Sequence, residues 1–440
     1  MNIADLRYVP DFRLEIGGTA IPAALRASVV GIKHESGLEG ADRVEVTLVN
    51  ENLRWLDHPL LKLDQPLALH LGYAPARPVQ VFVGEIVAVA AAFPADGPPT
   101  VTVVAQDRRQ RLQQGNKLRW FAIPIPTVGN FPLPDLATVA LVSLENMLIP
   151  IIDPVGAAIA VLLGGVEAVA AISDPGSAQK FIRKEANESD YKFLMRIAKE
   201  NGWEMVVDHS GPLGGHLLRF TSPLDHLSPD VTLQYGRSLI EFTPRITSVG
   251  QIFSVTAFIW ITPIKMTFAV TLGWDWDRMA LTLMIYPAGI TLQPGPSHFL
   301  IKDPVTPLTA PRRIIGELLP KLNKRLTGTG GTIGNPLIKA GAVLKLEGLG
   351  ETFGGLWRVT KATQSIGPNG YRTDFETRKE IWFGSIPAPV QGAIPIRTPF
   401  GTGSLPLPGP GALAAPTQII PGSPPVPGLG GARLPGPTLP

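Results

Sequence analysis

Residues 341–378 read GAVLKLEGLGETFGGLWRVTKATQSIGPNGYRTDFETR and contain three segments in which apolar and polar side chains alternate. A period of two is typical of strands with one buried face. We therefore predict strands at 342–347, 356–363 and 371–378. Gly348 and Gly350 separate the first two segments. Because a strand and not a helix follows them, we interpret these glycines as a β-turn and not as a phosphate-binding loop.

The first 113 residues are predicted to be all-β for the same reason. Glycine and proline separate three segments in which every second residue is apolar. Such short strands between turn residues are typical of a small barrel or sandwich. The apolar positions are Val44, Val46 and Leu48, then Leu67, Leu69 and Leu71, then Val79, Val81 and Val83.

A helix is predicted at 187–202, because Tyr191, Leu194 and Ala198 recur at helical spacing. Asn187 is the predicted N-cap. Asn201-Gly202 offers a left-handed stop, and a strand is expected at 203–207.

Two long apolar stretches raise the question of membrane contact. Residues 133–172 are mostly apolar, and 155–172 approach the roughly 20 residues that a membrane helix needs. We favour burial of this stretch against a neighbouring subunit over contact with lipid. Residues 252–272 are rich in β-branched and aromatic side chains and are divided by Pro263 and Lys265, so we predict two buried strands there.

The C-terminal part changes composition twice. Residues 311–327 are expected to include a short basic helix, and the glycines of 328–334 are expected to form a turn. From residue 386 on, 25 of 55 residues are Pro or Gly. Such a segment buries too little apolar area to offset its ordering entropy, so we predict a disordered, extended tail that could dock onto a partner.

Composition excludes several classes of function. The chain has no cysteine, which excludes disulfides and thiolate chemistry. Its net charge of +3 does not by itself imply nucleic-acid binding, so no nucleic-acid specificity is expected. The basic cluster Arg108, Arg109, Arg111, Lys117 and Arg119 is interpreted as a solvated face or an ion-pairing interface. Only 17% of residues are charged, which favours a surface partly covered by other subunits.

No catalytic, cofactor-binding or metal-binding residue is predicted. The seven histidines are scattered and no two have helical zinc-site spacing. Asp208-His209-Ser210 joins three triad residue types, but consecutive residues do not converge on one reaction centre, so we interpret it as a polar turn. Asp275 and Asp277 flank Trp276, and the sequence shows no further acid that would complete a glycosidase site with them. The chain is therefore predicted not to be an enzyme and to need no cofactor.

Two stretches carry a family resemblance. FIRKEANESDYKFL at 181–194, continued to Gly202-Trp203, resembles a strand–helix–strand pattern of the phage late control D family, which includes the hub portion of VgrG-type proteins and baseplate hubs. IKAGAVLKLEGLG at 338–350, with GYRTDFE at 370–376, is similar to the closing pattern of that family. The resemblance extends over residues 1–385.

The resemblance implies a mainly β tail-hub fold with α/β insertions and two related β-barrel domains per protomer. It also implies a homotrimer in which six barrels seat on a sixfold tail tube while a trimeric spike binds the other side. The expected partners are therefore the tail tube protein, the spike protein and other baseplate subunits. No β-helical spike follows residue 385, so the spike is expected to be a separate protein.

The expected domain boundaries follow from the residue patterns together with the family resemblance. They are a first β-barrel domain at 1–115, a mixed α/β domain at 116–235 with an apolar insert at about 120–175, a second β-barrel domain at 236–385 with an inserted β-rich segment at about 251–334, and a Pro/Gly-rich tail at 386–440.

The expected function is that of a structural baseplate hub in a phage tail or contractile injection system. The N-terminus shows no secretory signal, so we expect assembly in the cytoplasm and a final location in a virion tail or injection particle. The alternatives are a membrane-associated protein and a tail-borne cell-wall-degrading protein.

Overall fold

A computed structural model gives the structure of the chain. It describes residues 9–126, 129–158, 160, 161, 164, 165, 182–246, 254–261, 266–275, 280–287, 298–305, 323, 325–380, 393–398 and 401–406. The chain is mainly β with α/β insertions, as predicted. Four sheets make up the described part, and the largest has 13 strands.

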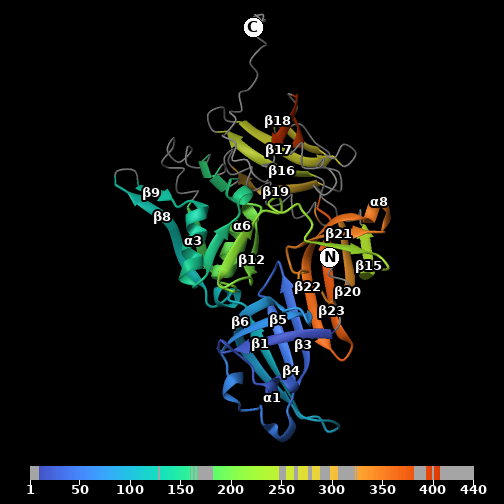
Figure 1. Cartoon of the computed structure of the whole chain (residues 1–440). Helices are drawn as coiled ribbons and strands as arrows, with labels where there is room; N and C mark the ends of the chain where they lie inside the picture. The colour runs from blue at the N-terminus through green and yellow to red at the C-terminus, as the bar shows by residue number, and fades with distance from the viewer. Residues whose placement is uncertain are drawn as a thin grey trace, which may run out of the picture.

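The N-terminal unit is a curled antiparallel sheet of order β3-β4-β7-β6-β5-β1-β2 (Figure 1). Short helical turns connect its strands. The strands are β1 (Val9–Ile16), β2 (Thr19–Ala20), β3 (Val29–Gly37), β4 (Arg43–Val49), β5 (Pro66–Ala74), β6 (Val79–Ala92) and β7 (Thr100–Gln106), and the helices are α1 (Ala23–Ala27), η2 (Glu51–Leu53), η3 (Pro59–Leu61) and α2 (Arg109–Leu112).

The alternation read from the sequence holds in β4 and β5, whose apolar positions form the core of this unit. It fails in β6. A bulge places Leu69 opposite Phe82 but His70 opposite Gln80, so Val81 is an extra residue in β6. The bulge reverses the faces of the strand locally, and Val81 and Phe82 are both buried while Val79 is exposed.

The middle segment combines two three-stranded sheets with two helices that pack between them around one core. Phe121 stacks on Phe193 with ring centroids 4.9 Å apart. The elements are β8 (Lys117–Ile125), β9 (Gly129–Pro132), α3 (Asp135–Glu145), β10 (Ile149–Ile152), β11 (Arg183–Glu188), α6 (Asp190–Glu200), β12 (Glu204–Asp208) and β13 (Leu217–Thr221).

The predicted helix at 187–202 is α6, but its N-cap is Ser189, whose side chain accepts a hydrogen bond from the Lys192 N–H. Asn187 is not the cap. It has φ +55° at an irregularity in β11, between Ala186 and Glu188. The stop was predicted correctly, because Gly202 has φ +69° immediately after the helix.

The C-terminal unit contains the three strands predicted from residues 341–378. These are β21 (Val343–Glu347), β22 (Gly355–Gly367) and β23 (Gly370–Arg378), joined by β14 (Val231–Gln234), β15 (Leu239–Ile246), β20 (Leu326–Ile333) and the short helix α8 (Gly350–Phe353). Gly348 and Gly350 have φ +81° and +71°, as the predicted turn requires.

Strand β22 joins the two β units into one sheet. Its first part pairs with β21, and its last part pairs antiparallel with β3, from Lys361 opposite Gly37 to Ile366 opposite Ile32. The N-terminal and C-terminal units therefore lie side by side with continuous backbone hydrogen bonding between them (Figure 1).

A fourth sheet, of order β19-β16-β17-β18-β24-β25, lies at the end of the molecule opposite the N-terminal unit. The apolar stretch 252–272 forms two antiparallel strands here, as predicted. The strands are β16 (Ser254–Ile261), β17 (Met266–Asp275), β18 (Ala280–Pro287), β19 (His298–Val305), β24 (Ala393–Thr398) and β25 (Gly401–Pro406).

The hairpin β24-β25 lies within the segment predicted to be an extended tail, and β24 pairs with β18 at two positions. The rest of that segment, the predicted basic helix at 311–327 apart from its last residues, and most of 155–172 lie outside the described residues. Within the described residues, no helix combines the length and apolarity needed to cross a membrane.

The glycine-rich turn predicted at 328–334 is wrong, because Gly328, Gly330 and Gly331 lie inside strand β20. A Cβ added to Gly330 would lie 2.7 Å from the Phe375 ring and 2.9 Å from the backbone oxygen of Glu241. A Cβ on Gly328 would lie 2.5 Å from the Phe242 ring. These glycines therefore allow aromatic rings to pack directly against the backbone of β20, and they do not reverse the direction of the chain.

We predict that Gly330→Ala lowers the free energy of unfolding by about 1–3 kcal/mol, because the Phe375 ring and a backbone oxygen must both shift. The matched control is Gly367→Ala in β22, where an added Cβ meets nothing within 4 Å. Urea denaturation of both variants checks this. Equal stabilities would contradict the account of β20.

Candidate functional site

The most heavily built polar cluster lies where the middle segment meets the N-terminal unit, and Arg109 is at its centre. The guanidinium group bonds Asp42 Oδ1 at 2.5 Å and Asp107 Oδ2 at 2.9 Å. It also donates to the backbone oxygens of Gly37 and Met205, each at 3.3 Å. Because Met205 belongs to β12 and Gly37 to β3, one buried side chain ties the two parts together.

His209 completes this cluster. Its Nδ1 accepts a hydrogen bond from the Val83 N–H at 3.1 Å, so the proton lies on Nε2, which donates to Asp42 Oδ2 at 3.0 Å. The imidazole packs on Phe82, with ring centroids 5.3 Å apart. The prediction of a polar turn at 208–210 is therefore wrong for His209, which is 6% exposed.

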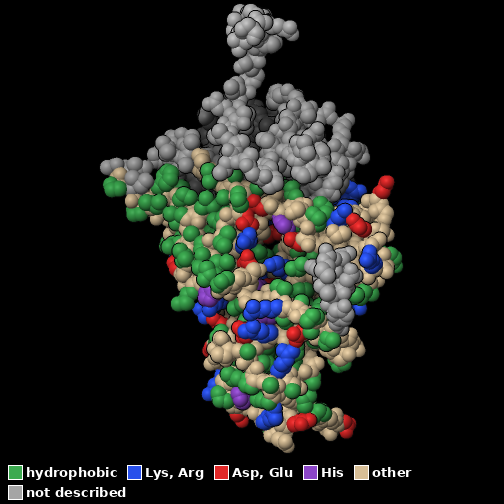
Figure 2. Space-filling model, in the orientation of Figure 1, with side chains coloured by type: hydrophobic (Ala, Val, Ile, Leu, Met, Phe, Trp, Pro, Cys, Tyr) green, Lys and Arg blue, Asp and Glu red, His purple; other side chains and the backbone are tan. Residues whose placement is uncertain are grey.

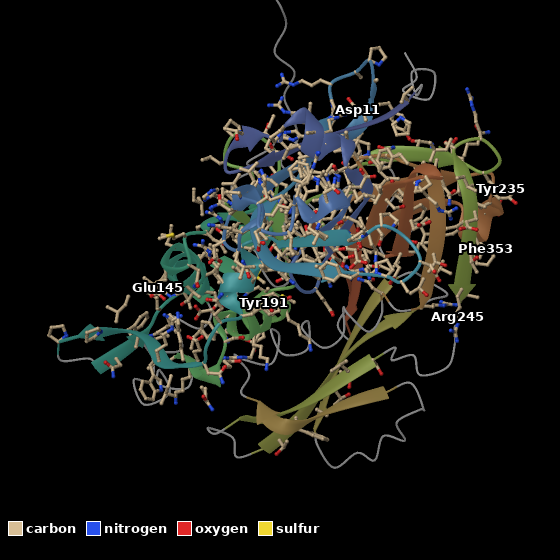
Figure 3. The ribbon with its side chains drawn as sticks, turned by 90° about the horizontal axis from the view of Figure 1, so that it is seen from below. Asp11, Glu145, Tyr191, Tyr235, Arg245 and Phe353 are labelled. Atoms are coloured by element: carbon tan, nitrogen blue, oxygen red, sulfur yellow. The ribbon has the colours of Figure 1, made fainter. Side chains whose placement is uncertain are left out.

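Helix α6 also contacts the N-terminal unit directly. Tyr191 Oη accepts a hydrogen bond from the Gly40 N–H at 2.6 Å. Figure 3 shows Tyr191 at the boundary between α6 and the strands of the N-terminal unit.

The same cluster contains a group of three potential metal ligands, Asp42, Asp107 and His209, whose ligand atoms lie within 4.8 Å of one another. Burial alone would raise the pKa of Asp42, but the Arg109 guanidinium and the His209 hydrogen bond outweigh it and hold that pKa well below its usual range. Since Arg109 and His209 already bond these carboxylates, the geometry fits an internal ion pair and not a cation site.

A second buried guanidinium joins the middle segment to the C-terminal unit. Arg358 bonds Glu380 at 2.8 Å, and both side chains are at most 1% exposed. Arg358 also donates to the backbone oxygens of Pro223 and His226, at 2.7 and 3.0 Å. Arg378 of β23 pairs with Glu204, the first residue of β12.

Strand β12 thus lies between both β units. Glu204 at its start contacts the C-terminal unit, while Met205 and the adjoining His209 contact the N-terminal unit. We call this arrangement, formed by Arg109, Asp42, Asp107, His209, Arg358, Glu380, Arg378 and Glu204, the β12 junction. Two of its contacts join the parts by side chains, in the Arg378–Glu204 pair and the His209–Asp42 hydrogen bond, and Arg109 and Arg358 join them through bonds to backbone oxygens of the middle segment.

The basic cluster read from the sequence is an ion-pairing region, one of the two predicted interpretations. Arg108 and Arg111 both pair with Glu85. Lys117 and Arg119 pair with Asp190 at 2.7 and 2.6 Å, and Arg119 also pairs with Glu145 and Glu185. These pairs link β8 to α3, β11 and α6 within the middle segment.

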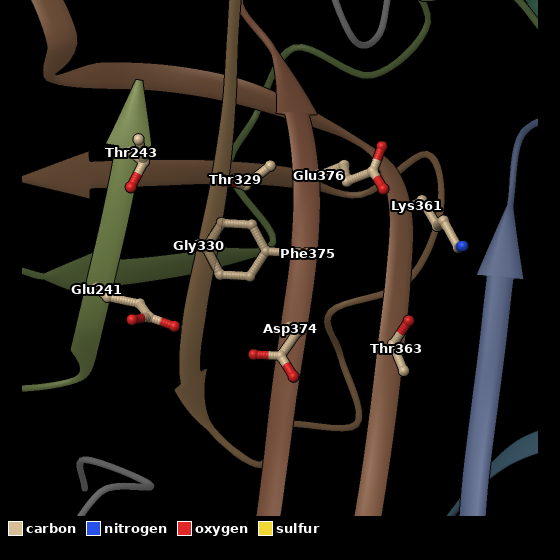
Figure 4. Close-up of a pocket in the computed structure, with 9 residues that line it drawn as sticks. All are labelled: Glu241, Thr243, Thr329, Gly330, Lys361, Thr363, Asp374, Phe375 and Glu376. Carbon is tan, nitrogen blue, oxygen red and sulfur yellow. The ribbon is translucent and has the colours of Figure 1, made fainter. Parts of the chain in front are cut away.

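A hollow of about 380 Å³ lies on the C-terminal sheet (Figure 4), lined by Glu241, Thr243, Thr329, Gly330, Lys361, Thr363, Asp374, Phe375 and Glu376. Two of its acids are neutralised, since Arg372 pairs with Glu241 and, at 2.7 Å, with Asp374. The hollow offers threonine hydroxyls and paired charges, with no nucleophile beside a base among these residues.

Of the other histidines, His34 packs on the Phe82 ring that His209 also contacts, with ring centroids 5.8 Å apart, and no further pair of histidines meets among the described residues. His34 is buried in the N-terminal core, His58 caps η3, His216 contacts Arg108, and His226 pairs with Asp230 at 2.9 Å, while His70 and His298 lie in β5 and β19. Asp275 ends β17, and Asp277 lies outside the described residues.

No protein-family model and no curated protein sequence matches the chain. Solved structures do. The chain is similar to the 43 kDa tail protein of prophage MuSo2 from Shewanella oneidensis, with a TM-score of 0.56 and 12% identity over 84% of this chain and 98% of that one. A tail protein from Neisseria meningitidis MC58 gives a TM-score of 0.54 and 12% identity, over 86% of this chain and 98% of that one.

A third similar structure is the E. coli c3393 protein, a component of the type VI secretion system that is described as similar to the T4 bacteriophage tail proteins gp27 and gp5. It gives a TM-score of 0.51 and 13% identity, over 87% of this chain and 82% of that one. These likenesses establish a fold shared with tail proteins over most of the chain.

We predict that Arg109→Met destabilises the protein by about 3–5 kcal/mol, because it leaves the Asp42 and Asp107 carboxylates buried without their cation. The matched control is Arg13→Met, which removes an exposed ion pair with Glu15 and should change stability by less than about 1 kcal/mol. The free energy of unfolding in urea measures both. A loss below 1 kcal/mol for Arg109→Met would contradict a structural role for the cluster.

The buried imidazole of His34 leads us to predict that the free energy of unfolding depends on pH. Burial lowers its pKa from 6.5 to about 4, and neither ring nitrogen has a hydrogen-bond partner among the described residues. Between these values the unfolded chain binds a proton that the folded chain does not, so stability falls as the pH drops from 6.5 towards 4. The total loss is about 3 kcal/mol.

His34→Leu should remove this part of the pH dependence. The measurement is the free energy of unfolding of both proteins from pH 7.5 to 4, and the difference between the two curves isolates His34. Parallel curves would show that His34 is not the group responsible.

Proposed function

We propose that the chain is the structural hub of a baseplate, in a phage tail or contractile injection system, and belongs to the late control D type. In this proposal it forms a homotrimer that adapts a sixfold tail tube to a trimeric spike. The observation that carries the proposal is the arrangement of two β units side by side in one sheet, joined by β22 and β3.

The number of β units per chain supports the proposal. One chain offers two neighbouring β units, so three chains related by a threefold axis offer six such units around it. A ring of six units matches a sixfold tube on one face and keeps threefold symmetry for a spike on the other. The folds shared with tail proteins from Shewanella and Neisseria support the same assignment.

The β12 junction supports a mechanical and non-enzymatic role. Its cross-links favour one orientation of the two β units and the middle segment, because a displacement of β12 would break the Arg378–Glu204 pair, the His209–Asp42 hydrogen bond and the bond that Arg109 donates to the Met205 backbone oxygen. An adaptor between two symmetries depends on such fixed orientation of its parts.

The domain plan follows from this proposal. We assign 1–115 to the first barrel, 116–235 to the mixed domain, 236–385 to the second barrel with an inserted β-rich segment at about 251–334, and 386–440 to the tail. Strand β14, at the end of the mixed domain, adds to the sheet of the second barrel by pairing with β21. Partners are the tail tube, the spike and other baseplate subunits, and the protein assembles in the cytoplasm before it becomes part of the particle.

Mass photometry of the purified chain tests the proposal. We expect a species of about three times the 47.1 kDa mass of the chain, with ring-shaped particles of six lobes in negative-stain electron microscopy. A chain that stays monomeric at micromolar concentration would overturn the trimeric hub.

A further inference from the structure

The loop 209–216, between β12 and β13, docks onto strand β6 through glycines that leave no room for a side chain. A Cβ added to Gly214 would lie 2.5 Å from Gln80 Nε2, and one added to Gly215 would lie 2.8 Å from Val83 Cβ. The Gln80 amide also donates to a backbone oxygen of the loop at 2.6 Å. The loop is therefore a closely fitted contact between the middle segment and the N-terminal unit, and it begins and ends with a histidine.

Both histidines hold this contact by accepting a hydrogen bond on Nδ1. His209 accepts from the Val83 N–H at 3.1 Å, and His216 accepts from the Arg108 guanidinium, which can only donate. A lone pair on Nδ1, with the proton on Nε2, exists only in the neutral imidazole. A proton on either ring therefore removes the hydrogen bond and sets an N–H group against the donor that the ring faced.

Positive groups surround His216. Burial and the guanidinium groups of Arg108 and Arg111 lower the pKa of this imidazole. Glu85, which pairs with both arginines, and a hydrogen bond to the Met147 backbone act in the opposite direction and are outweighed. Figure 2 shows Lys and Arg side chains on the N-terminal unit next to the middle segment. A proton on His216 is thus placed against positive charge.

Acidic side chains partly offset a charge on His209. Its Nε2 donates to Asp42, which like Asp107 already shares the Arg109 guanidinium. A proton on His209 therefore costs the hydrogen bond from Val83 but strengthens the contact with Asp42, so His216 carries most of the response. The other charged or titratable groups near the loop lie on β12, β13, α6 and the C-terminal unit, and they are Asp208, Arg219, Tyr191 and Lys339.

A third histidine lies beneath the docked loop. The Phe82 ring contacts His209 on one side and His34 on the other, with ring centroids 5.3 and 5.8 Å apart. Neither nitrogen of His34 has a hydrogen-bond partner among the described residues, and burial lowers its pKa to about 4, with His209 adding to the shift and Asp42 and Glu35 opposing it. Undocking of the loop takes His209 off the Phe82 ring and lets water approach His34, so acid favours the undocked loop here as well.

The middle segment contacts the C-terminal unit through groups of another kind. These contacts are the Arg378–Glu204 pair and the bonds that Arg358 donates to the Pro223 and His226 backbone oxygens. Arginine stays charged throughout the range in which histidine titrates. Acid therefore acts first on the side of the middle segment that faces the N-terminal unit.

We propose that the loop 209–216 is an acid-sensitive latch, in which protonation of the histidines releases the middle segment from the N-terminal unit while the C-terminal unit stays attached. The docked state binds fewer protons than the released state, so the latch is closed above about pH 6.5 and opens as the pH falls below that value. This inference goes beyond the proposed function and does not rest on it.

Hydrogen exchange at the Val83 amide tests the latch in the full chain, since His209 Nδ1 accepts from this N–H. We expect its protection, corrected for the pH dependence of the intrinsic exchange rate, to fall about tenfold between pH 7.5 and pH 5. The reference is the amide of Val103, which lies in β7 between β4 and β6 and should stay protected. An equal loss at both amides would mean that the whole unit unfolds, and an unchanged Val83 amide would mean that the loop stays docked. Either result overturns the inference.

Asparagine variants identify the histidines responsible. His209→Asn and His216→Asn each supply a carbonyl oxygen that accepts a hydrogen bond and is not protonated in this range. In the double variant we expect the protection of the Val83 amide to be the same at pH 5 as at pH 7.5. The control is His58→Asn, which removes a histidine whose Nδ1 accepts a backbone hydrogen bond outside the loop, and it should respond as the wild type does.

The single variant His216→Asn leaves the Val83 contact unaltered, so it gives the same test if the double variant does not dock at pH 7.5. We expect it to lose most of the acid response. If neither the double nor the single variant loses less protection in acid than the wild type, other groups open the loop and the latch is overturned.

Discussion

Two buried guanidinium groups constrain the whole molecule. Arg109 and Arg358 are each 1% exposed, and each pairs with a carboxylate of its own β unit while it donates to a backbone oxygen of the middle segment. Removing a cation from water is expensive, and the cost is offset only when its partners are correctly placed. Each β unit holds its guanidinium group by an ion pair of its own, and the middle segment must then place the Met205, Pro223 and His226 backbone oxygens where these groups can donate to them.

Local patterns explain how far the sequence could predict this fold. The period-two segments of β4, β5 and β23 report which face of a strand is buried, because the signal lies within each strand, whereas in β22 Trp357, Arg358 and Val359 are all buried. The β12 junction gives no such signal. Asp42 and His209 are 167 residues apart and meet only after β3, β4 and β12 have formed. His209 also follows a strand and precedes glycines, which is the pattern of an ordinary turn.

Two errors have a common physical origin. Glycine and asparagine mark positions that tolerate unusual backbone geometry, but the sequence does not say why the geometry is needed. Asn187 adopts φ +55° in an irregular strand and not at a helix cap. The glycines of β20 make room for Phe242 and Phe375 inside a sheet. In both cases the deciding group belongs to another part of the chain, and the sequence window that contains the glycine or asparagine does not include it.

The distribution of charge separates two kinds of surface. On the outer face of the C-terminal sheet Arg372 neutralises Glu241 and Asp374, and the remaining side chains are largely threonines and lone charges. Such a face is well solvated and gains little from a partner. The outer face of α3 has the opposite character, since Leu141 and Leu144 are 47% and 59% exposed while Glu145 at the end of the helix is paired with Arg119. Among the described residues several charges are likewise held in internal pairs, as Arg183 is with Asp135 and Glu200. Covering the outer face of α3 would remove apolar area from water without desolvating an unpaired charge, whereas covering the threonine-lined face would strip water from lone charges.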